Sequence, residues 1–369
     1  MIKKQYQCIG KMRVAIFFML MNFLPFAQAQ AEQTKAKVFH GMSDASAAVA
    51  LSKDIFVVAD DENNVLRLYE RSGVAYPVGS VDLNEFLGTD PEHPESDIEG
   101  ATRVGDRIYW ITSHGRNKDG KFRESRYRFF ATKIVTENDK LTLKPEGNVC
   151  ANLLESMLRI PELRKLGLDR AAGWDGSLEK KQRKKLAPKK DGLNIEALSA
   201  TPNGKMLYIG FRNPRPGKKA VVLPFLNAAA VIEKQQAPVF GKPLLWDLKG
   251  LGIRAMEYSS QDNSYFIVAG FHDERKGCVL YRWLGQIIEV PEYLYPIAPD
   301  VPDFTAEAII QFEGEDNLWF FSDDGSMLID IASEAECMPG EAHNGKCQNK
   351  YLIDPNKKTF RAISLKPHL

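Results

Sequence analysis

The sequence predicts an all-β fold, a β-propeller of five or six blades, from three observations. One strand–turn–strand pattern returns five times along the chain, starting at Ser43, Ser96, Leu193, Ile253 and Phe304. Each copy contains polar or acidic residues, a short apolar strand, a turn of Gly, Asp, Asn or Ser, and a second, strongly β-prone strand. Further strand-like runs follow the copies, and a single stretch of the chain has helical apolar spacing.

Units of three or four antiparallel strands that repeat five times are typical of a propeller, in which blades pack radially and leave only short edges. A sandwich followed by a second β domain is the main alternative, but it does not explain why one hairpin returns five times. A parallel α/β fold requires helices between its strands. A sixth, degenerate blade is expected either between residues 136 and 190 or on completion by the N-terminal strand KAKVF.

The longest interruption of the repeat is an insertion over about residues 151–191. Its first part, LLESMLRIPELRKLGL, has helical apolar spacing and predicts a helix packed on the propeller as a cap. Its second part, EKKQRKKLAPKK, is a basic run that predicts a solvated loop, with a docking patch for an acidic surface as the alternative.

The first 30 residues have the pattern of a signal peptide. Basic residues come first, then an apolar stretch over residues 14–24, and then the small-x-small sequence Ala27-Gln28-Ala29. The apolar stretch is shorter than the roughly 20 residues of a membrane-spanning helix. We therefore expect residues 1–30 to be cleaved, residues 31–369 to form a single propeller domain, and the protein to be periplasmic or secreted without a transmembrane anchor.

Cleavage would remove four of the 49 basic residues and none of the 48 acidic ones, which leaves a formal net charge of about −3. This charge gives no reason to expect nucleic acid as a partner.

Four cysteines remain after the predicted cleavage, and an even count outside the cytoplasm favours disulfides. Cys337 and Cys347 enclose a polar loop and form the most natural local pair, which leaves Cys150 with Cys278. The alternative is that Cys150 and Cys278 are two unrelated buried thiols.

Four glutamates occupy nearly the same place in their repeats, at or just before the first strand of the hairpin: Glu99, Glu196, Glu257 and Glu307. The first strand of a propeller blade lines the central channel, so we expect a ring of carboxylates at one end of it. Carboxylates brought together need protons, arginines or a hard cation such as Ca²⁺ to offset their repulsion. Alternatively, each glutamate accepts backbone hydrogen bonds at the hub and binds nothing.

Several residues near this ring are candidate ligand contacts: Asp44, Asn194, Arg212 and Arg254. Arg116 is a further candidate to neutralise the carboxylates. The ends of the second strands contribute polar residues to the same face, where loops build sites. Among them, His114 with Arg116, and His272 with Asp273, are candidates for acid, base or anion-binding roles. Asp323-Asp324-Gly325 indicates a tight turn rather than a metal site.

Carboxylates, histidines and arginines at one end would suit hydrolysis of a phosphate ester with a bound cation. No GxSxG, P-loop or HExxH motif occurs in the sequence. The GxGxxA pattern that starts at Gly250 lacks a βαβ context and leads into a repeat strand.

The segments SDASAAVA, FVVADDENNVLRLY, SDIEGAT, WITSHGRNKDGK, GLNIEALSATPNGKMLYIGFRNP and GIRAMEY resemble, in this order, the bacterial family called domain of unknown function 3616. The resemblance runs from about Gly41 to Asp330 and implies a propeller-like fold, distantly similar to the esterase-like phytase propellers. It implies no activity. The basic insertion near residue 180 and the cysteine loop over residues 337–347 depart from the pattern, which leaves the shape of one rim open.

Three functions are therefore expected, in this order. The first is an exported propeller that binds a cation or a small polar ligand at an acidic channel mouth. The second is a calcium-assisted phosphomonoesterase or other esterase, which would act on a phosphorylated ligand. The third is an envelope platform that binds protein partners. Ca²⁺ is the one cofactor that these interpretations imply.

Overall fold

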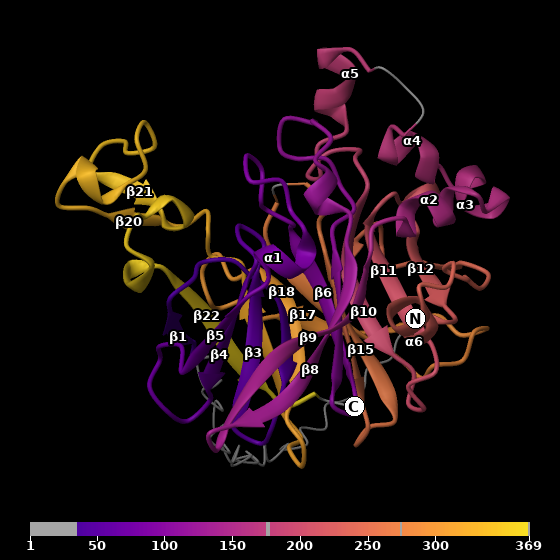
Figure 1. Ribbon diagram of the computed structural model, residues 1–369, viewed down its shortest axis with the longest axis horizontal. Helices are drawn as coiled ribbons and strands as arrows, with labels where there is room; N and C mark the ends of the chain where they lie inside the picture. Colours follow the sequence, from indigo (N-terminus) through magenta and orange to yellow (C-terminus); the bar gives the residue numbers. More distant parts are fainter. Residues whose placement is uncertain (1–34, 175–177, 274, 368–369) are drawn as a thin grey trace, which may run out of the picture. The chain divides into compact units, whose positions relative to one another are not determined.

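The computed structural model describes residues 35–174, 178–273 and 275–367, and these residues belong to one compact unit. Within them the chain forms five antiparallel sheets of four strands each, together with one separate two-stranded sheet (Figure 1). The predicted all-β propeller is confirmed, and it has five blades.

Four blades are each built from consecutive strands, which neighbour one another in sequence order. The first blade consists of β2 (Ala45–Ala50), β3 (Ile55–Asp60), β4 (Val65–Glu70) and β5 (Gly79–Asp82), and the second of β6 (Ile98–Val104), β7 (Arg107–Thr112), β8 (Phe129–Glu137) and β9 (Lys140–Cys150). The third blade consists of β10 (Asn194–Ala200), β11 (Leu207–Asn213), β12 (Ala220–Phe225) and β13 (Leu244–Trp246). The fourth consists of β14 (Gly252–Ser259), β15 (Ser264–Gly270), β16 (Cys278–Trp283) and β17 (Glu292–Ile297). The first two strands of each blade are the repeated hairpin of the sequence.

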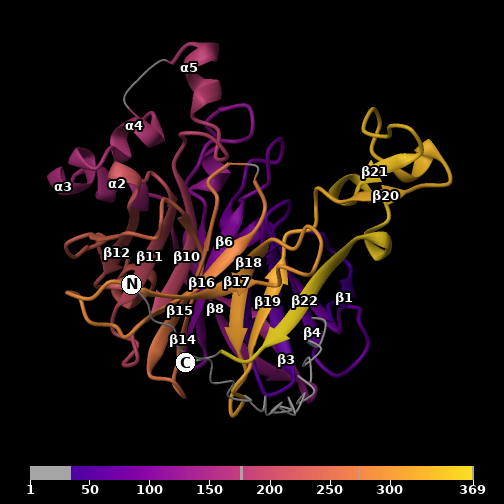
Figure 2. The same cartoon turned by 180° about the vertical axis from the view of Figure 1, so that it is seen from behind.

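The fifth blade combines both ends of the described chain. Its inner strands are β18 (Ala306–Gln311) and β19 (Leu318–Ser322), followed by β22 (Thr359–Leu365) and, at the outer edge, β1 (Lys37–His40). Strands β22 and β1 pair antiparallel and lie side by side in both views (Figure 2). The N-terminal strand therefore completes the fifth blade instead of a sixth, and this pairing closes the circle of blades.

An apolar cluster fills each interface between neighbouring blades. Trp110 and Phe130 pack between the first and second blades, and Trp246 and Trp283 pack between the third and fourth, with ring centroids 4.9 Å apart. A strand inside a blade is covered on both faces, which is why β3 and β11 are buried along most of their length. Radial packing thus converts one repeated hairpin into a continuous core.

The insertion after the second blade forms short helices, namely α2 (Leu153–Leu158), α3 (Pro161–Lys165), α4 (Leu168–Ala172) and α5 (Lys180–Lys185). The first three bury their apolar side chains against the second and third blades, as a packed cap would. The basic run was expected to be a loop, but its first half is the helix α5. A capping box between Glu179 and Gln182 starts this helix and satisfies two of its free backbone groups.

The remaining helices are short connections between strands. They are α1 (Asn84–Leu87), α6 (Ala228–Lys234) and the 3₁₀ turns Glu124–Arg126, Pro216–Lys218, Glu334–Glu336, Asn349–Tyr351 and Pro355–Lys357.

A disulfide-bonded excursion leaves the fifth blade between β19 and β22. It contains β20 (Leu328–Asp330) and β21 (Lys346–Gln348), and it projects from the same end of the blades as α5 (Figures 1 and 2). The Cys337–Cys347 disulfide is present, as predicted. The second expected disulfide is absent: Cys150 in β9 and Cys278 in β16 are free buried thiols, because they belong to different blades.

The predicted signal peptide over residues 1–30 lies outside the described residues. None of the helices in the described part of the chain combines the length and the apolar character needed to cross a bilayer.

Candidate metal and ligand site at one end of the channel

Each of the five inner strands has a β-bulge near its start. The register with the second strand shifts at the same place in β2, β6, β10, β14 and β18, so one residue per strand has no partner opposite it. The bulged residues are Ser46, Glu99, Glu196, Arg254 and Glu307. A bulge re-aims its side chain locally, and here it happens once per blade at the same level of the hub.

Three of these residues, Glu99, Glu196 and Glu307, line one small cavity together with Ser46. Its volume is about 10 Å³, about the space that one water molecule requires. Small residues next to the bulges allow this close packing: a Cβ on Gly100 would lie 3.0 Å from the backbone nitrogen of Leu198. The channel is therefore closed at this level by converging side chains.

Glu257 does not join the other three glutamates. It lies three residues beyond the bulge of β14 and lines a separate cavity of about 330 Å³ with Gln311 and Thr102. Thr102, Glu257 and Gln311 lie toward the ends of β6, β14 and β18, whereas the bulges lie near their starts. This cavity is therefore at the other end of the channel. Burial raises the pKa of Glu257 to about 8. Arg254 takes the equivalent place in the ring, so the ring has three carboxylates and one guanidinium.

Arginines neutralise two of the ring glutamates. The Arg254 guanidinium forms an ion pair with Glu307 and lies 3.2 Å, Nη1 to Oε2, from Glu196. Arg212 Nη1 donates to Glu196 Oε1 at 2.6 Å, and Asn194 Nδ2 donates to the same oxygen at 2.6 Å. All of these side chains are buried. Burial raises the pKa of Glu307 to about 7, although Arg254 acts in the opposite direction.

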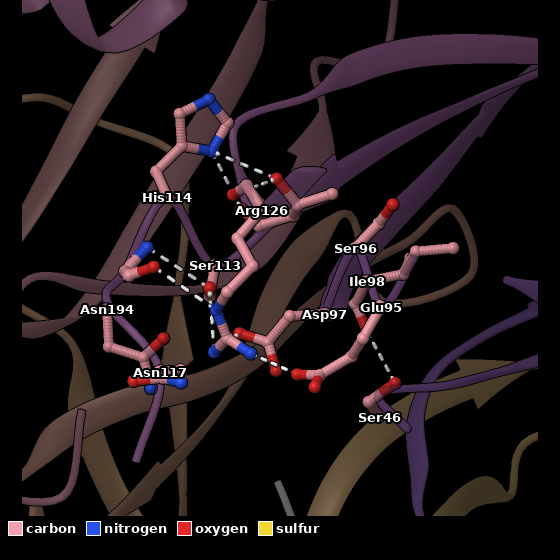
Figure 3. Close-up of polar contacts among 12 residues, drawn as sticks. Ser46, Glu95, Ser96, Asp97, Ile98, Ser113, His114, Asn117, Arg126 and Asn194 are labelled. Atoms are coloured by element: carbon pink, nitrogen blue, oxygen red, sulfur yellow. Dashed lines mark hydrogen bonds and ion pairs between the residues drawn. The ribbon is translucent and has the colours of Figure 1, made fainter. Parts of the chain in front are cut away.

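Glu99 is different, because it forms no hydrogen bond or ion pair with any residue that the structure describes. Its side chain is only 7% exposed. Burial raises its pKa well above the ordinary value, and the charges of Asp97, Glu196 and Glu307 raise it further. The Arg126 guanidinium, whose charge acts on Glu99, is occupied: it forms ion pairs with Asp97 and Glu95 instead (Figure 3).

Acidic side chains from the first blade lie against Glu99. The carboxylate oxygens of Asp61, Asp97 and Glu99 come within 4.8 Å of one another, and so do those of Asp44, Asp60 and Asp61. Asp61 belongs to both groups, which we call the Glu99 group and the Asp44 group. Each set of three carboxylates lies close enough to share one cation.

The members of the two groups differ in how well their oxygens are satisfied. Asp60 accepts hydrogen bonds from the Glu62 backbone N–H at 3.0 Å and from Asn63 at 2.9 Å, and Asp44 accepts one from the Ser43 hydroxyl at 2.5 Å. By contrast, Asp61 Oδ1 is buried and has no hydrogen-bond partner. Among the described residues, neither Asp61 Oδ1 nor the Glu99 carboxylate therefore has a hydrogen-bond or ion-pair partner.

The carboxyl groups at this end of the channel raise one another's pKa. Burial raises the pKa of Asp61 well above its ordinary value, and Asp44, Glu62 and Glu99 raise it further. Burial and the neighbouring Asp323 likewise raise the pKa of Asp44. A buried carboxyl group with a raised pKa is stabilised either by a bound proton or by a nearby cation.

One cation from the disulfide-bonded excursion reaches this end. Lys350 Nζ lies 2.5 Å from Glu62 Oε1. Burial lowers the pKa of Lys350, but the charges of Glu62, Asp44 and Asp61 raise it to a net value above the usual range. Lys350 is therefore charged and acts on the acidic cluster from the solvent side.

Two of the residues expected to act as acid, base or anion contact, His114 and Arg116, are held by contacts with backbone carbonyl groups. His114 is fully buried, and its Nδ1 lies 2.9 Å from the carbonyl oxygen of Thr112. Burial lowers its pKa to about 4, so the ring is neutral at pH 7, and Figure 3 shows it turned away from Asp97. Arg116 donates to three backbone carbonyls, those of Gly120, Ala172 and Gly173, and so anchors the end of α4.

His272 lies at the same end, in a cationic environment. Burial lowers its pKa, and the nearby Arg215 lowers it further, while Asp273 acts in the opposite direction.

Asp323 accepts a hydrogen bond from the Gly325 backbone N–H at 3.0 Å, which is the tight turn expected from the sequence.

Sequence reasoning missed two basic residues that act on the acidic side chains at this end of the channel. Arg126 ends the 3₁₀ turn before β8, where no repeat position marks it, and Lys350 lies outside the repeats altogether. Asp61 was recognisable as a polar residue at the end of a second strand, but its contact with Glu99 depends on packing between two blades.

Solved structures of other proteins show distant likeness to this chain. A putative oxidoreductase (glucose dehydrogenase) from Thermus thermophilus is 11% identical, with a TM-score of 0.42 over 90% of this chain and 100% of that one. The β-propeller domain of Cps50 from Myceliophteria thermophila is 8% identical, with a TM-score of 0.36 over 89% and 98%. The hydrazine synthase of Kuenenia stuttgartiensis is 8% identical, with a TM-score of 0.35 over 87% and 71%.

No curated protein matches the chain in sequence. One family model does match, over residues 168–295, and its description is "protein of unknown function (DUF3616)". The match runs from α4 through the third blade and into the last strand of the fourth, so it includes Glu196, Arg212, Arg254 and Glu257. The chain therefore carries a domain of the DUF3616 family within a five-bladed β-propeller.

Proposed function

We propose that this protein binds a divalent cation, Ca²⁺, at the acidic end of its channel, through Asp61, Asp97 and Glu99. The observation that carries the proposal is the unsatisfied state of this group: three carboxylates converge, and neither Glu99 nor the Oδ1 atom of Asp61 has a partner in the described chain. Buried carboxylates without a counter-charge are costly, so a bound cation would remove an energetic penalty that the fold otherwise retains.

The type of ligand atom favours a hard cation. Every candidate ligand of the Glu99 group is a carboxylate oxygen, which suits Ca²⁺ and Mg²⁺ better than soft transition metals. Ca²⁺ tolerates irregular coordination and accepts waters as additional ligands. Such flexibility fits a group in which Asp97 also remains paired with Arg126.

The proposed compartment is outside the cytoplasm, and two features support it. The Cys337–Cys347 disulfide is typical of proteins in oxidising compartments. The first 30 residues have the signal-peptide pattern.

Calcium titration of the metal-depleted protein tests the proposed function. We expect binding heat in calorimetry and a rise in the melting temperature when Ca²⁺ is added, because a ligand that binds only the folded state stabilises it. Asp61→Asn keeps the side-chain shape but removes the charge, and it should weaken Ca²⁺ binding at least about tenfold, roughly 1.4 kcal/mol.

Asp106→Asn is the matched control, because Asp106 is an exposed aspartate of a turn in the second blade, away from the Glu99 group. It should bind Ca²⁺ as the wild-type protein does. Absence of any calcium effect on the wild-type protein, or equal affinities for the wild-type and Asp61→Asn proteins, would refute the proposal.

A further inference from the structure

A second cavity lies beside the arginine-paired part of the ring. It has a volume of about 350 Å³ and is lined by five basic side chains, which are Lys189, Arg212, Arg254, Arg275 and Lys276. The acidic side chains in its wall are Asp273, Glu307 and Asp323. We propose that this cavity binds a compact oxyanion, a ligand with a phosphoryl group or with carboxylates.

Four of the five basic side chains of this cavity are of two kinds, and the fifth, Arg275, is paired with Asp273. Arg212 and Arg254 are only 2% and 3% exposed, and their contacts with the ring glutamates hold them in place. Lys189, in contrast, has no hydrogen-bond or ion-pair partner in the described parts of the chain, and Lys276 lies 3.5 Å from its single partner, Asp303. Fixed guanidinium groups and available ammonium groups together suit an anion, because charge-assisted hydrogen bonds to oxyanions are the strong ones.

Neutral donors complete the wall. Thr305, Ser326 and Gln348 line the cavity, and their side chains form no hydrogen bond within the residues that the structure covers. Hydroxyl and amide N–H groups donate to oxyanions as lysine does. Free donors of three chemical kinds therefore surround one space, and a ligand rich in acceptor oxygens would satisfy all of them.

The position of the cavity supports a binding role. Lys189 follows α5 in the basic insertion, and Gln348 ends β21 in the disulfide-bonded excursion. Both segments lie outside the four-stranded sheets of the blades. Both therefore contribute to one cavity at the channel end, in the manner of loops that build a site on a rigid scaffold.

The size of the cavity limits the ligand. A volume of about 350 Å³ is at the lower end of the roughly 300–1,000 Å³ of small-molecule pockets. We therefore expect a compact ligand rather than a polymer. The inference is independent of the proposed cation site, because it rests on different side chains.

Calorimetric titration with inorganic phosphate and, separately, with malonate tests this inference. The protein is freed of metal on a chelating resin and kept in Tris–chloride, because a soluble polycarboxylate chelator would itself compete for the cavity. We expect one site per chain for at least one of the two anions. Binding of phosphate alone identifies a phosphoryl ligand, and binding of malonate alone identifies a carboxylate ligand.

The test variant is Lys189→Met combined with Lys276→Met, which removes two charges from exposed positions without touching the buried arginines. We expect its affinity for the anion to fall at least about tenfold. Lys184→Met is the control, since Lys184 is an exposed lysine of the same basic insertion that does not line the cavity. The inference is overturned if neither anion binds at millimolar concentration, or if the double variant and the control bind equally well. Because calcium is absent, this result does not depend on the cation site.

Discussion

Two parts of the acidic end of the channel differ in whether their carboxylates are paired with arginines. In the paired part, formed by the third to fifth blades, Glu196 and Glu307 contact Arg212 and Arg254. In the unpaired part, formed by the first and second blades, Asp61 and Glu99 converge without a counter-charge of their own. Glu99, Glu196 and Glu307 are all buried, so the difference shows which carboxylates the fold itself neutralises.

The largest expected effect on stability comes from a variant that disrupts the paired part. Arg254→Met leaves two buried carboxylates without their shared cation, and we expect the free energy of unfolding to fall by about 3–5 kcal/mol. Urea denaturation followed by tryptophan fluorescence measures this loss.

Two further variants test the cause of that loss. Glu307→Gln added to Arg254→Met should recover part of the stability, because it removes one of the stranded charges. Arg159→Met is the control: Arg159 is 75% exposed and pairs only with Glu155, so its loss should cost less than about 0.5 kcal/mol. Equal losses for Arg254→Met and Arg159→Met would show that the paired part does not depend on the arginine.

The second effect is smaller and has the opposite sign. Glu99→Gln removes an unpaired buried carboxylate, so we expect the metal-free protein to become more stable by about 1–3 kcal/mol at pH 8. Because the folded-state pKa of Glu99 is raised, its contribution is favourable at low pH and is lost as the pH rises above the ordinary value of 4.5.

The difference between the Gln variant and the wild-type protein should therefore be close to zero near pH 4 and grow toward pH 8. Denaturation curves over this pH range, without metal, measure it. The same variant should no longer be stabilised by Ca²⁺. A Gln variant that is less stable than the wild-type protein at pH 8 would mean that Glu99 already has a partner in solution.

The smallest effect concerns the cation on the solvent side. Lys350→Met removes a charge that acts on Asp44 and Asp61, and we expect Ca²⁺ to bind about threefold more tightly as a result. Calorimetry compares this variant with Lys346→Met, which removes a lysine paired with Asp330 elsewhere in the excursion. Unchanged or weaker calcium binding in Lys350→Met would place the proposed ion beyond the influence of Lys350.

Much of the fold could be predicted because it is local. The five hairpins are each contained within about 20 residues, and the strand, turn and strand signals follow directly from residue type. The Cys337–Cys347 disulfide was predictable for the same reason, since its sequence separation is only 10 residues. The sequence alone does not decide between five and six blades, because closure depends on pairing between β1 and β22 from opposite ends of the described chain.

The candidate site was predictable only in outline. The sequence alone indicated that acidic residues at the start of the repeats gather at one end of the channel, and three of the four glutamates do. The exception, Glu257, is three residues away from Arg254, which has the equivalent place. A strand turns every second side chain to the same face, but a bulge changes that phase by one residue, so similar strand sequences do not align by eye.

The sequence by itself therefore determined the repeated hairpin, the all-β class and the end of the channel at which polar residues gather. Only the tertiary structure decided which carboxylate is neutralised and by which residue. Arg126 pairs with Asp97 from 29 residues away, Arg254 with Glu307 from 53, and Lys350 with Glu62 from 288. The physical reason is that electrostatic pairing depends on distance in space and on burial. Both are set by how the blades close into a ring.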